Sequence, residues 1–179
     1  MKKVSITLII LIILFFLGWS SIIQSDPQSG TVQLLDLKTN TTLDKASAVD
    51  ALRSKRIVLV GEFHDNAQHH QVQLEVIRML HQAGLSVAIG LEMFRQDSQE
   101  SLDRWVDGKE DEVRFMSIYR DNWNYDWDLY RPIFSFAREN RIPMVGLNVS
   151  RRITAQVAYH GFQSLSPAQR GDLSGITCD

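Results

Sequence analysis

The stretch from Arg56 to His70, RIVLVGEFHDNAQHH, constrains the fold of this chain more than any other. It begins with a continuous apolar run, the pattern of a parallel strand that is covered on both faces. A polar turn follows, and Asp65 with Gln68 three residues later forms a capping box that predicts the start of a helix. The junction between the strand and the helix therefore collects the polar side chains Glu62, His64, Asp65, His69 and His70.

The rest of the sequence repeats this alternation of apolar strands and amphipathic helices. After a short edge strand, three buried strands and intervening helices give the order of a single α/β domain. We expect a parallel sheet flanked by helices over residues 31–179. The edge strand is expected at 31–37 and the buried strands at 56–61, 86–92 and 143–147. Helices are expected at 45–53, 66–83, 97–106 and 111–119, then through Phe134 and Ala137 to Asn140, and from Asn148 or Ser150 through Ala158. Because residues 165–179 read like the opening of a further helical unit, we expect this domain to be incomplete at its C-terminus.

A charge-free apolar segment precedes the domain. Lys2 and Lys3 are followed by Val4 to Ile23, and about twenty helical residues span roughly 30 Å, the thickness of the bilayer's hydrocarbon core. We therefore predict a signal anchor or signal peptide over residues 1–25 and a linker over 26–30, and favour an anchor because no small-x-small cleavage site follows. The two lysines predict that the domain lies on the outer side of the cytoplasmic membrane.

Charge and cysteine content exclude two classes of protein. The formal net charge is −2, and −4 once Lys2 and Lys3 are set aside, which argues against nucleic acid as a partner. Cys178 is the only cysteine, so the chain has no internal disulfide and no lipoprotein attachment site beside the apolar segment.

Polar residues follow each of the three buried strands, where open α/β sheets bind their ligands. If the first two strands are neighbours, about 4.8 Å apart, Glu62 and Glu92 reach one ion or one water. Glu62, His64 and Glu92 are thus candidate ligands of a divalent transition metal, with salt-bridged or packed side chains as the alternative. After the third strand come Asn148, Arg151 and Arg152; the two arginines open a helix, a position that favours bound anions.

The two later histidines of the opening stretch lie in the first turn of the predicted helix. His69 shares a helical face with Val72 and Val76, so we expect it to point towards the sheet and His70 to have a lesser role. A helix N-terminus disfavours the imidazolium, which predicts neutral rings suited to ligation or hydrogen bonding. A packed or solvated side chain is the alternative for both.

Aromatic residues are densest between Trp123 and Phe134. Trp127, Tyr130 and Phe134 have i, i+3, i+7 spacing, which predicts first of all a core stripe. The alternative is one wall of a flat apolar pocket, from which a tyrosinate binds haem iron.

Four motifs together resemble the ChaN-like family of bacterial haem-binding proteins, within the wider Tiki and erythromycin-esterase-like superfamily. They are GEFHDNAQHHQVQ from Gly61, GLEMF from Gly90, WNYDWDLYRPI from Trp123 and GLNVSRR from Gly146. The resemblance implies an exported, membrane-associated protein that binds haem, forms a homodimer around it and acts in iron or haem acquisition. Its haem contacts are expected among His64, His69, Tyr130, Asn148, Arg151 and Arg152, with a tyrosine or histidine on the iron and arginines near the propionates.

Two other functions stay open at this point. Relatives in the superfamily use the corresponding glutamate and histidine residues in metal-dependent hydrolysis, which maps onto Glu62, His64 and Glu92 as catalytic residues. The remaining alternative is a binding domain whose polar turn serves only its fold.

Overall fold

The computed structural model describes residues 7–11 and 33–171, and it confirms the α/β class with a parallel sheet. The sheet has the strand order β4-β1-β5-β6, and each neighbouring pair is parallel. A separate antiparallel hairpin pairs β2 with β3. The strands are β1 Thr7–Leu11, β2 Leu34–Asp36, β3 Thr41–Leu43, β4 Ile57–Leu59, β5 Val87–Arg95 and β6 Met144–Asn148.

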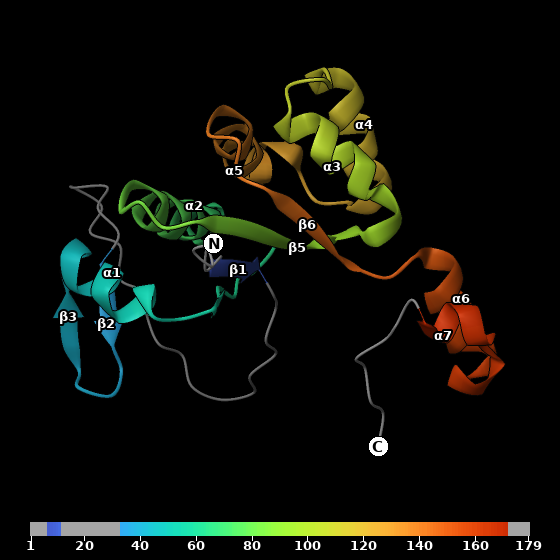
Figure 1. Ribbon diagram of the computed structural model, residues 1–179, viewed down its shortest axis with the longest axis horizontal. Coiled ribbons are helices and arrows are strands. Elements are labelled where there is room, and N and C mark those ends of the chain that lie inside the picture. Colours follow the sequence, from blue (N-terminus) through green and yellow to red (C-terminus); the bar gives the residue numbers. More distant parts are fainter. Residues whose placement is uncertain (1–6, 12–32, 172–179) are drawn as a thin grey trace, which may run out of the picture.

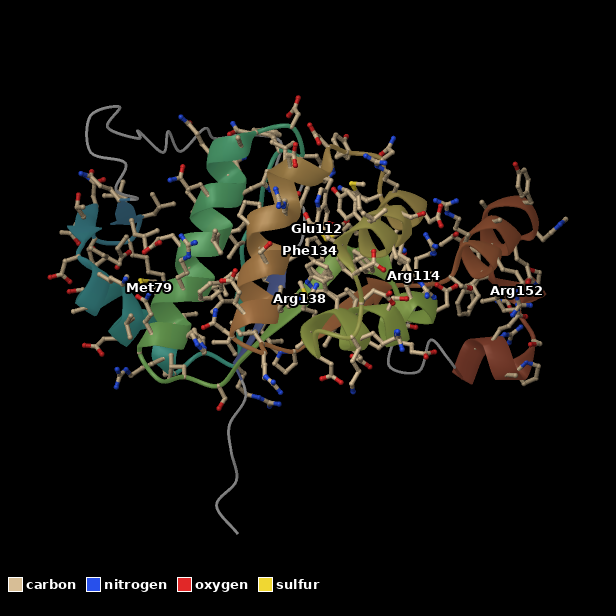
Figure 2. All side chains as sticks on the ribbon, turned by 90° about the horizontal axis from the view of Figure 1, so that it is seen from above. Met79, Glu112, Arg114, Phe134, Arg138 and Arg152 are labelled. Carbon is tan, nitrogen blue, oxygen red and sulfur yellow. The ribbon has the colours of Figure 1, made fainter. Side chains whose placement is uncertain are left out.

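Helices connect the strands and lie largely on one side of the sheet. In Figure 1, α2 to α5 lie above β5, whereas α6 and α7 extend beyond the end of β6. The view from above agrees, with α2 and α5 running side by side (Figure 2). The helices are α1 Lys45–Arg53, α2 Ala67–Gln82, α3 Gln99–Val106, α4 Glu112–Asn122, α5 Trp127–Glu139, α6 Arg151–His160 and α7 Pro167–Gly171, with 3₁₀ turns at Gln96–Ser98 and Phe162–Ser164.

Helix starts follow local capping chemistry. The Asp44 side chain accepts a hydrogen bond from the Ser47 backbone N–H, which confirms the predicted start of α1. Helix α2 begins one residue later than predicted, because Asn66 rather than Asp65 accepts from the first backbone N–H groups, those of Gln68 and His69. Asn66 itself closes a turn back to the Phe63 carbonyl at 2.9 Å. The cap therefore ties the GEFH turn to α2.

The core lies between the sheet and helices α2 to α5. Phe94 of β5 packs against Phe115 of α4 and Phe134 of α5, with ring centroids 5.9 and 5.6 Å apart. Trp127, Tyr130 and Phe134 are all buried, which confirms that they form a core stripe. The indole N–H of Trp105 donates to the Phe134 carbonyl at 2.8 Å, so α3 and α5 are also joined by a buried hydrogen bond.

On the opposite face of the sheet, the edge strands β4 and β6 are exposed, whereas Ala88 and Gly90 of β5 are buried. Leu59, Ile10, Gly90 and Val145 form one row across the four strands, and Leu59 and Val145 are 49% and 37% exposed. Ile57, on the same face of β4, is 53% exposed. The prediction that the 56–61 strand is covered on both faces is therefore wrong for the described part of the chain, since β4 is an edge strand with one open face.

The N-terminal apolar segment differs from prediction where the structure describes it. Thr7–Leu11 forms β1 in the centre of the sheet instead of part of one long helix over 4–23. A charge-free apolar run suits a central parallel strand as well as a membrane helix, and here strand pairing on both sides satisfies its backbone. The other residues of the predicted anchor and linker, 1–6 and 12–30, lie outside the described residues. Within the described ranges, no helix has the length and apolar content needed to cross a membrane.

A bulge where β5 meets β6 places the two strands in very close contact. Pairing is regular as far as Leu91 with Gly146 and resumes only at Arg95 with Asn148. A Cβ on Gly146 would lie 2.7 Å from the Arg95 carbonyl oxygen, closer than real Cβ contacts allow. Only glycine therefore fits opposite Arg95 in this irregularity at the end of the strand.

We predict that Gly146→Ala destabilises the protein by about 1–3 kcal/mol, the usual cost of forcing an extra methyl into a packed site. Urea unfolding followed by circular dichroism measures the change. Gly171→Ala is the control, because nothing lies within 4 Å of its Cβ position, and we expect a change below about 1 kcal/mol. Equal unfolding midpoints for both variants would contradict the close contact.

Candidate functional site

The carboxylate of Glu62, just beyond β4, is the centre of the polar site. Its side chain is only 6% exposed. One oxygen, Oε1, accepts from the Tyr130 hydroxyl at 2.8 Å and lies 2.9 Å from Nδ1 of His64. The other oxygen, Oε2, lies 2.7 Å from Nδ1 of His70. A carboxylate can only accept, so Oε1 takes the protons of Tyr130 and His64, whereas Oε2 is paired with His70 by a close contact outside hydrogen-bond geometry.

His70 carries a buried positive charge. Its side chain is 2% exposed, and Nδ1 faces two acceptors, Oε2 of Glu62 and Oε1 of Gln73 at 3.2 Å. Its Nε2 lies 3.1 Å from the backbone carbonyl of His64, a third acceptor. Acceptors at both ring nitrogens favour the imidazolium, and they raise the pKa of His70. This corrects the expectation of a neutral ring, because the contacts with Glu62 and the two other acceptors outweigh the position at a helix N-terminus.

The ionisation of Glu62 and His70 follows from these contacts. Burial alone would raise the pKa of Glu62, but the contacts with His70, His64 and Tyr130 outweigh burial and lower it. Burial would likewise lower the pKa of His70, yet the contacts with Glu62 and with the His64 carbonyl raise it. Burial and the nearby Glu62 charge raise the pKa of Tyr130 well above its usual value, so this tyrosine is a neutral donor.

His64 is held between the carboxylate and two aromatic rings. Its Nδ1 faces Oε1 of Glu62, which places the proton of the neutral ring on Nδ1 and the lone pair on Nε2. Trp123 packs edge-on against the ring with centroids 4.7 Å apart, and Tyr125 lies at 4.5 Å. No hydrogen bond to Nε2 is present within residues 33–171. The ring is thus fixed in orientation, with a basic nitrogen available for a ligand.

His69 lies on the outer side of the same turn. Its Nδ1 accepts from the backbone N–H of Phe63 at 2.8 Å, and the two rings stack with centroids 5.4 Å apart. Phe63 is 72% exposed. The prediction that His69 points towards the sheet and His70 has the lesser role is therefore reversed. Both stripes of α2 are apolar and buried further along the helix, and only in its first turn do they differ, with His70 buried and His69 half-buried.

The predicted metal site is not assembled. Because β1 lies between β4 and β5, these strands are about two spacings, roughly 9.6 Å, apart instead of one. The expectation that Glu62 and Glu92 reach one ion required the two strands to be neighbours. The Glu62 carboxylate is instead in contact with His64, His70 and Tyr130. In the described part of the chain, no group of three His, Cys, Asp or Glu side chains lies close enough to hold a metal ion.

The arginines at the end of β6 line a separate cleft of about 590 Å³. Arg95 and Arg151 both donate to the backbone carbonyl of Asp121, at 3.0 and 2.6 Å. Arg152 also lines the cleft and lies with α6, far from Phe134 at the centre of the molecule (Figure 2). Sequence reasoning missed Arg95, although its position at the end of a buried strand was the available signal. The other lining residues are Gln96, Asp97, Ser150 and Ile153.

Asn148 does not line this cleft. It ends β6 opposite Arg95, and its side-chain oxygen accepts from the neighbouring Val149 N–H at 3.0 Å. The structure thus brings together Glu62, His64 and Tyr130 in one place and Arg151 with Arg152 in another, while His69 and Asn148 make local contacts.

Fold and site define an α/β protein with a glutamate–histidine cluster just beyond an edge strand of a parallel sheet, beside aromatic side chains. Residues 48–177 match the family described as haem-binding uptake, Tiki superfamily, ChaN, and the chain belongs to this family. This confirms the resemblance found in the four sequence motifs.

A plant protein is also similar to this chain. Protein RETICULATA-RELATED 5, chloroplastic, of Arabidopsis thaliana is 26% identical over 150 residues, which are 75% of this chain and 20% of the plant protein. The chain therefore spans about a fifth of the length of this relative. No solved structure matches the chain.

We predict a pH-dependent loss of stability when His70 is replaced. His70→Leu leaves the buried Glu62 charge without its cation, which costs about 3–5 kcal/mol for pairs of this kind. The contribution of His70 is complete below its unfolded pKa of 6.5 and is lost as pH rises through its raised folded pKa. The contribution of Glu62 is present above 4.5 and is lost as pH falls through its lowered folded pKa.

The difference in unfolding free energy between wild type and His70→Leu should accordingly be largest between pH 4.5 and 6.5. Urea titrations at a series of pH values measure it. His160→Leu, at an exposed position at the end of α6, serves as the control and should show no such maximum. A difference for His70→Leu that is flat from pH 4 to 9 would contradict a buried ion pair.

Proposed function

We propose that this protein binds haem, with Nε2 of His64 as the iron ligand. The observation that carries the proposal is the geometry of His64, whose Nδ1 is held by a carboxylate while Nε2 has no hydrogen bond within residues 33–171. Histidines that bind metals usually donate their other ring N–H to a carboxylate or carbonyl, which fixes the tautomer and makes the ligand more basic. Membership of a haem-binding family supports the same conclusion.

Tyr130 is a less suitable iron ligand than His64. Its hydroxyl is committed to Glu62, its side chain is fully buried, and its raised pKa opposes the tyrosinate that iron prefers. His64, by contrast, has aromatic side chains beside it that could pack against a porphyrin. Trp123 and Tyr125 flank the imidazole, and Tyr125 is 38% exposed. These side chains fit a flat apolar ligand.

The arginine cleft supplies positive charge for the haem propionates. Arg151 binds the carbonyl of Asp121, which lies only two residues before Trp123. Two residues of chain span at most about 7 Å, so the cleft lies near the aromatic side of His64. Arg95 and Arg151 donate here to a backbone carbonyl, and guanidinium groups also form charge-assisted hydrogen bonds with carboxylates such as a propionate.

A hemin titration of the full chain in detergent tests this proposal. We expect a saturable Soret band, and His64→Ala should weaken binding at least about tenfold, since changes even in groups that only orient a metal ligand cost 10–100-fold. His81→Ala, near the other end of α2, is the matched histidine control and should bind like wild type. Absence of saturable binding to the wild-type chain would refute the function.

We also propose that the chain is exported, associates with the cytoplasmic membrane from the outer side and acts in haem or iron acquisition. Lys2, Lys3 and the charge-free run up to Ile23 support this. An alkaline phosphatase fusion after residue 171 should be active in a bacterial host, because that reporter folds only outside the cytoplasm. Replacing Lys2 and Lys3 by glutamate should reduce its activity, and an inactive wild-type fusion of normal abundance would contradict export.

The homodimer implied by the family resemblance stays a prediction. Size-exclusion chromatography with light scattering, with and without hemin, measures it directly.

A further inference from the structure

One oxygen atom of Glu62 serves two donors. Oε1 accepts from the Tyr130 hydroxyl at 2.8 Å and from Nδ1 of His64 at 2.9 Å, and the two donor atoms lie 3.5 Å apart. The other oxygen, Oε2, is held by His70. Tyr130 and His64 therefore compete for the same negative charge.

The packing of Tyr130 keeps its hydroxyl hydrogen-bonded to Oε1. Its side chain is fully buried, and its ring packs against His70 with centroids 4.1 Å apart. It is also fixed in α5, where its neighbours Ile133 and Phe134 belong to the core. The core packing of Tyr130 thus places its hydroxyl on Oε1 of Glu62.

We infer that Tyr130 is a positioning residue that limits how strongly His64 donates to haem iron, by sharing Oε1 of Glu62. The inference rests on the proposed haem binding through His64. A stronger hydrogen bond from Nδ1 to a carboxylate gives the imidazole more anionic character, and outer contacts of this kind tune the potential of a bound metal. A second donor on the same oxygen weakens that bond and so favours ferrous over ferric iron.

Tyr130→Phe separates this role from a merely structural one. Removing the hydroxyl leaves Oε1 to His64 alone, so we expect the reduction equilibrium of the bound iron to shift about tenfold towards the ferric form. For a one-electron couple this is ~59 mV to lower potential. The ferrous iron–histidine stretching frequency in resonance Raman spectra should rise in the same variant.

Tyr119→Phe is the matched control. Tyr119 is also fully buried and its ring lies 6.0 Å from that of Tyr130, but its hydroxyl has no hydrogen-bond partner in the described residues. The control should keep the wild-type potential within about twofold in the equilibrium constant. Haem binding with an unchanged potential in Tyr130→Phe would overturn the inference and leave the proposed function intact.

A graded substitution avoids reliance on a variant that fails to fold. Incorporating 3-fluorotyrosine at position 130 keeps the shape of Tyr130 but makes the hydroxyl a stronger donor. The potential should then move in the opposite direction, towards ferrous iron. A shift of the same sign as in Tyr130→Phe, or none, would overturn the inference.

The haem-free protein provides a test that is independent of haem binding. In ¹⁵N NMR spectra at a single neutral pH, the Nδ1–H resonance of His64 should move downfield in Tyr130→Phe, because its hydrogen bond to Glu62 strengthens, and should stay in place in Tyr119→Phe. An unmoved resonance refutes the sharing of Oε1. Failure of the wild-type chain to bind hemin refutes the proposed function instead.

Discussion

A buried carboxylate is costly, and the local structure around Glu62 is arranged to compensate that cost. An isolated charge at this depth would protonate or destabilise the fold, so it must be paired and hydrogen-bonded. The partners come from separate parts of the chain: His64 from the turn after β4, His70 from the first turn of α2, and Tyr130 from α5. One side chain therefore joins the edge of the sheet to the two helices that cover it.

These contacts of Glu62 also fix the orientation of the side chains in the site. Asn66 caps α2 and closes the turn back to Phe63, which brings His70 beneath the backbone carbonyl of His64. The charged His70 then holds Oε2 of Glu62, so the carboxylate cannot rotate away from His64. His64 is thereby held in one orientation, with Nδ1 on the carboxylate, by the same contacts that stabilise the fold. A substitution of Glu62 would therefore change function and stability together. A substitution of the Tyr130 hydroxyl would remove only one contact, from an oxygen that His64 also contacts.

Much of this could be predicted because it depends on local rules. Apolar runs, polar caps and helical spacing correctly give the strands at 56–61, 86–92 and 143–147, the start of α1 at Asp44, and the core role of Trp127, Tyr130 and Phe134. The prediction that His69, and not His70, points towards the sheet was wrong. Both helical stripes are apolar, so spacing alone does not show which of the two histidines is buried. The prediction of a neutral His70 ring was wrong for a related reason. The carboxylate and the carbonyl beside the ring come from outside α2, so the spacing of the helix does not reveal them. Arg95 was missed although it ends a buried strand, because its contact with Asp121 joins residues far apart in the sequence.

Strand order is the property that sequence reasoning constrained least, and it determines which carboxylates meet. Glu62 follows β4 and Glu92 lies within β5, and Thr7–Leu11 pairs between these two strands, which were expected to be neighbours. A segment that crosses a bilayer cannot at the same time supply a central strand to the sheet. With β1 in place the strands stay two spacings apart and Glu62 is satisfied by histidine and tyrosine; with the segment in a membrane, β4 and β5 would each lose a pairing partner along their inner edge. The position of these five residues therefore links the question of export directly to the chemistry that the site can support.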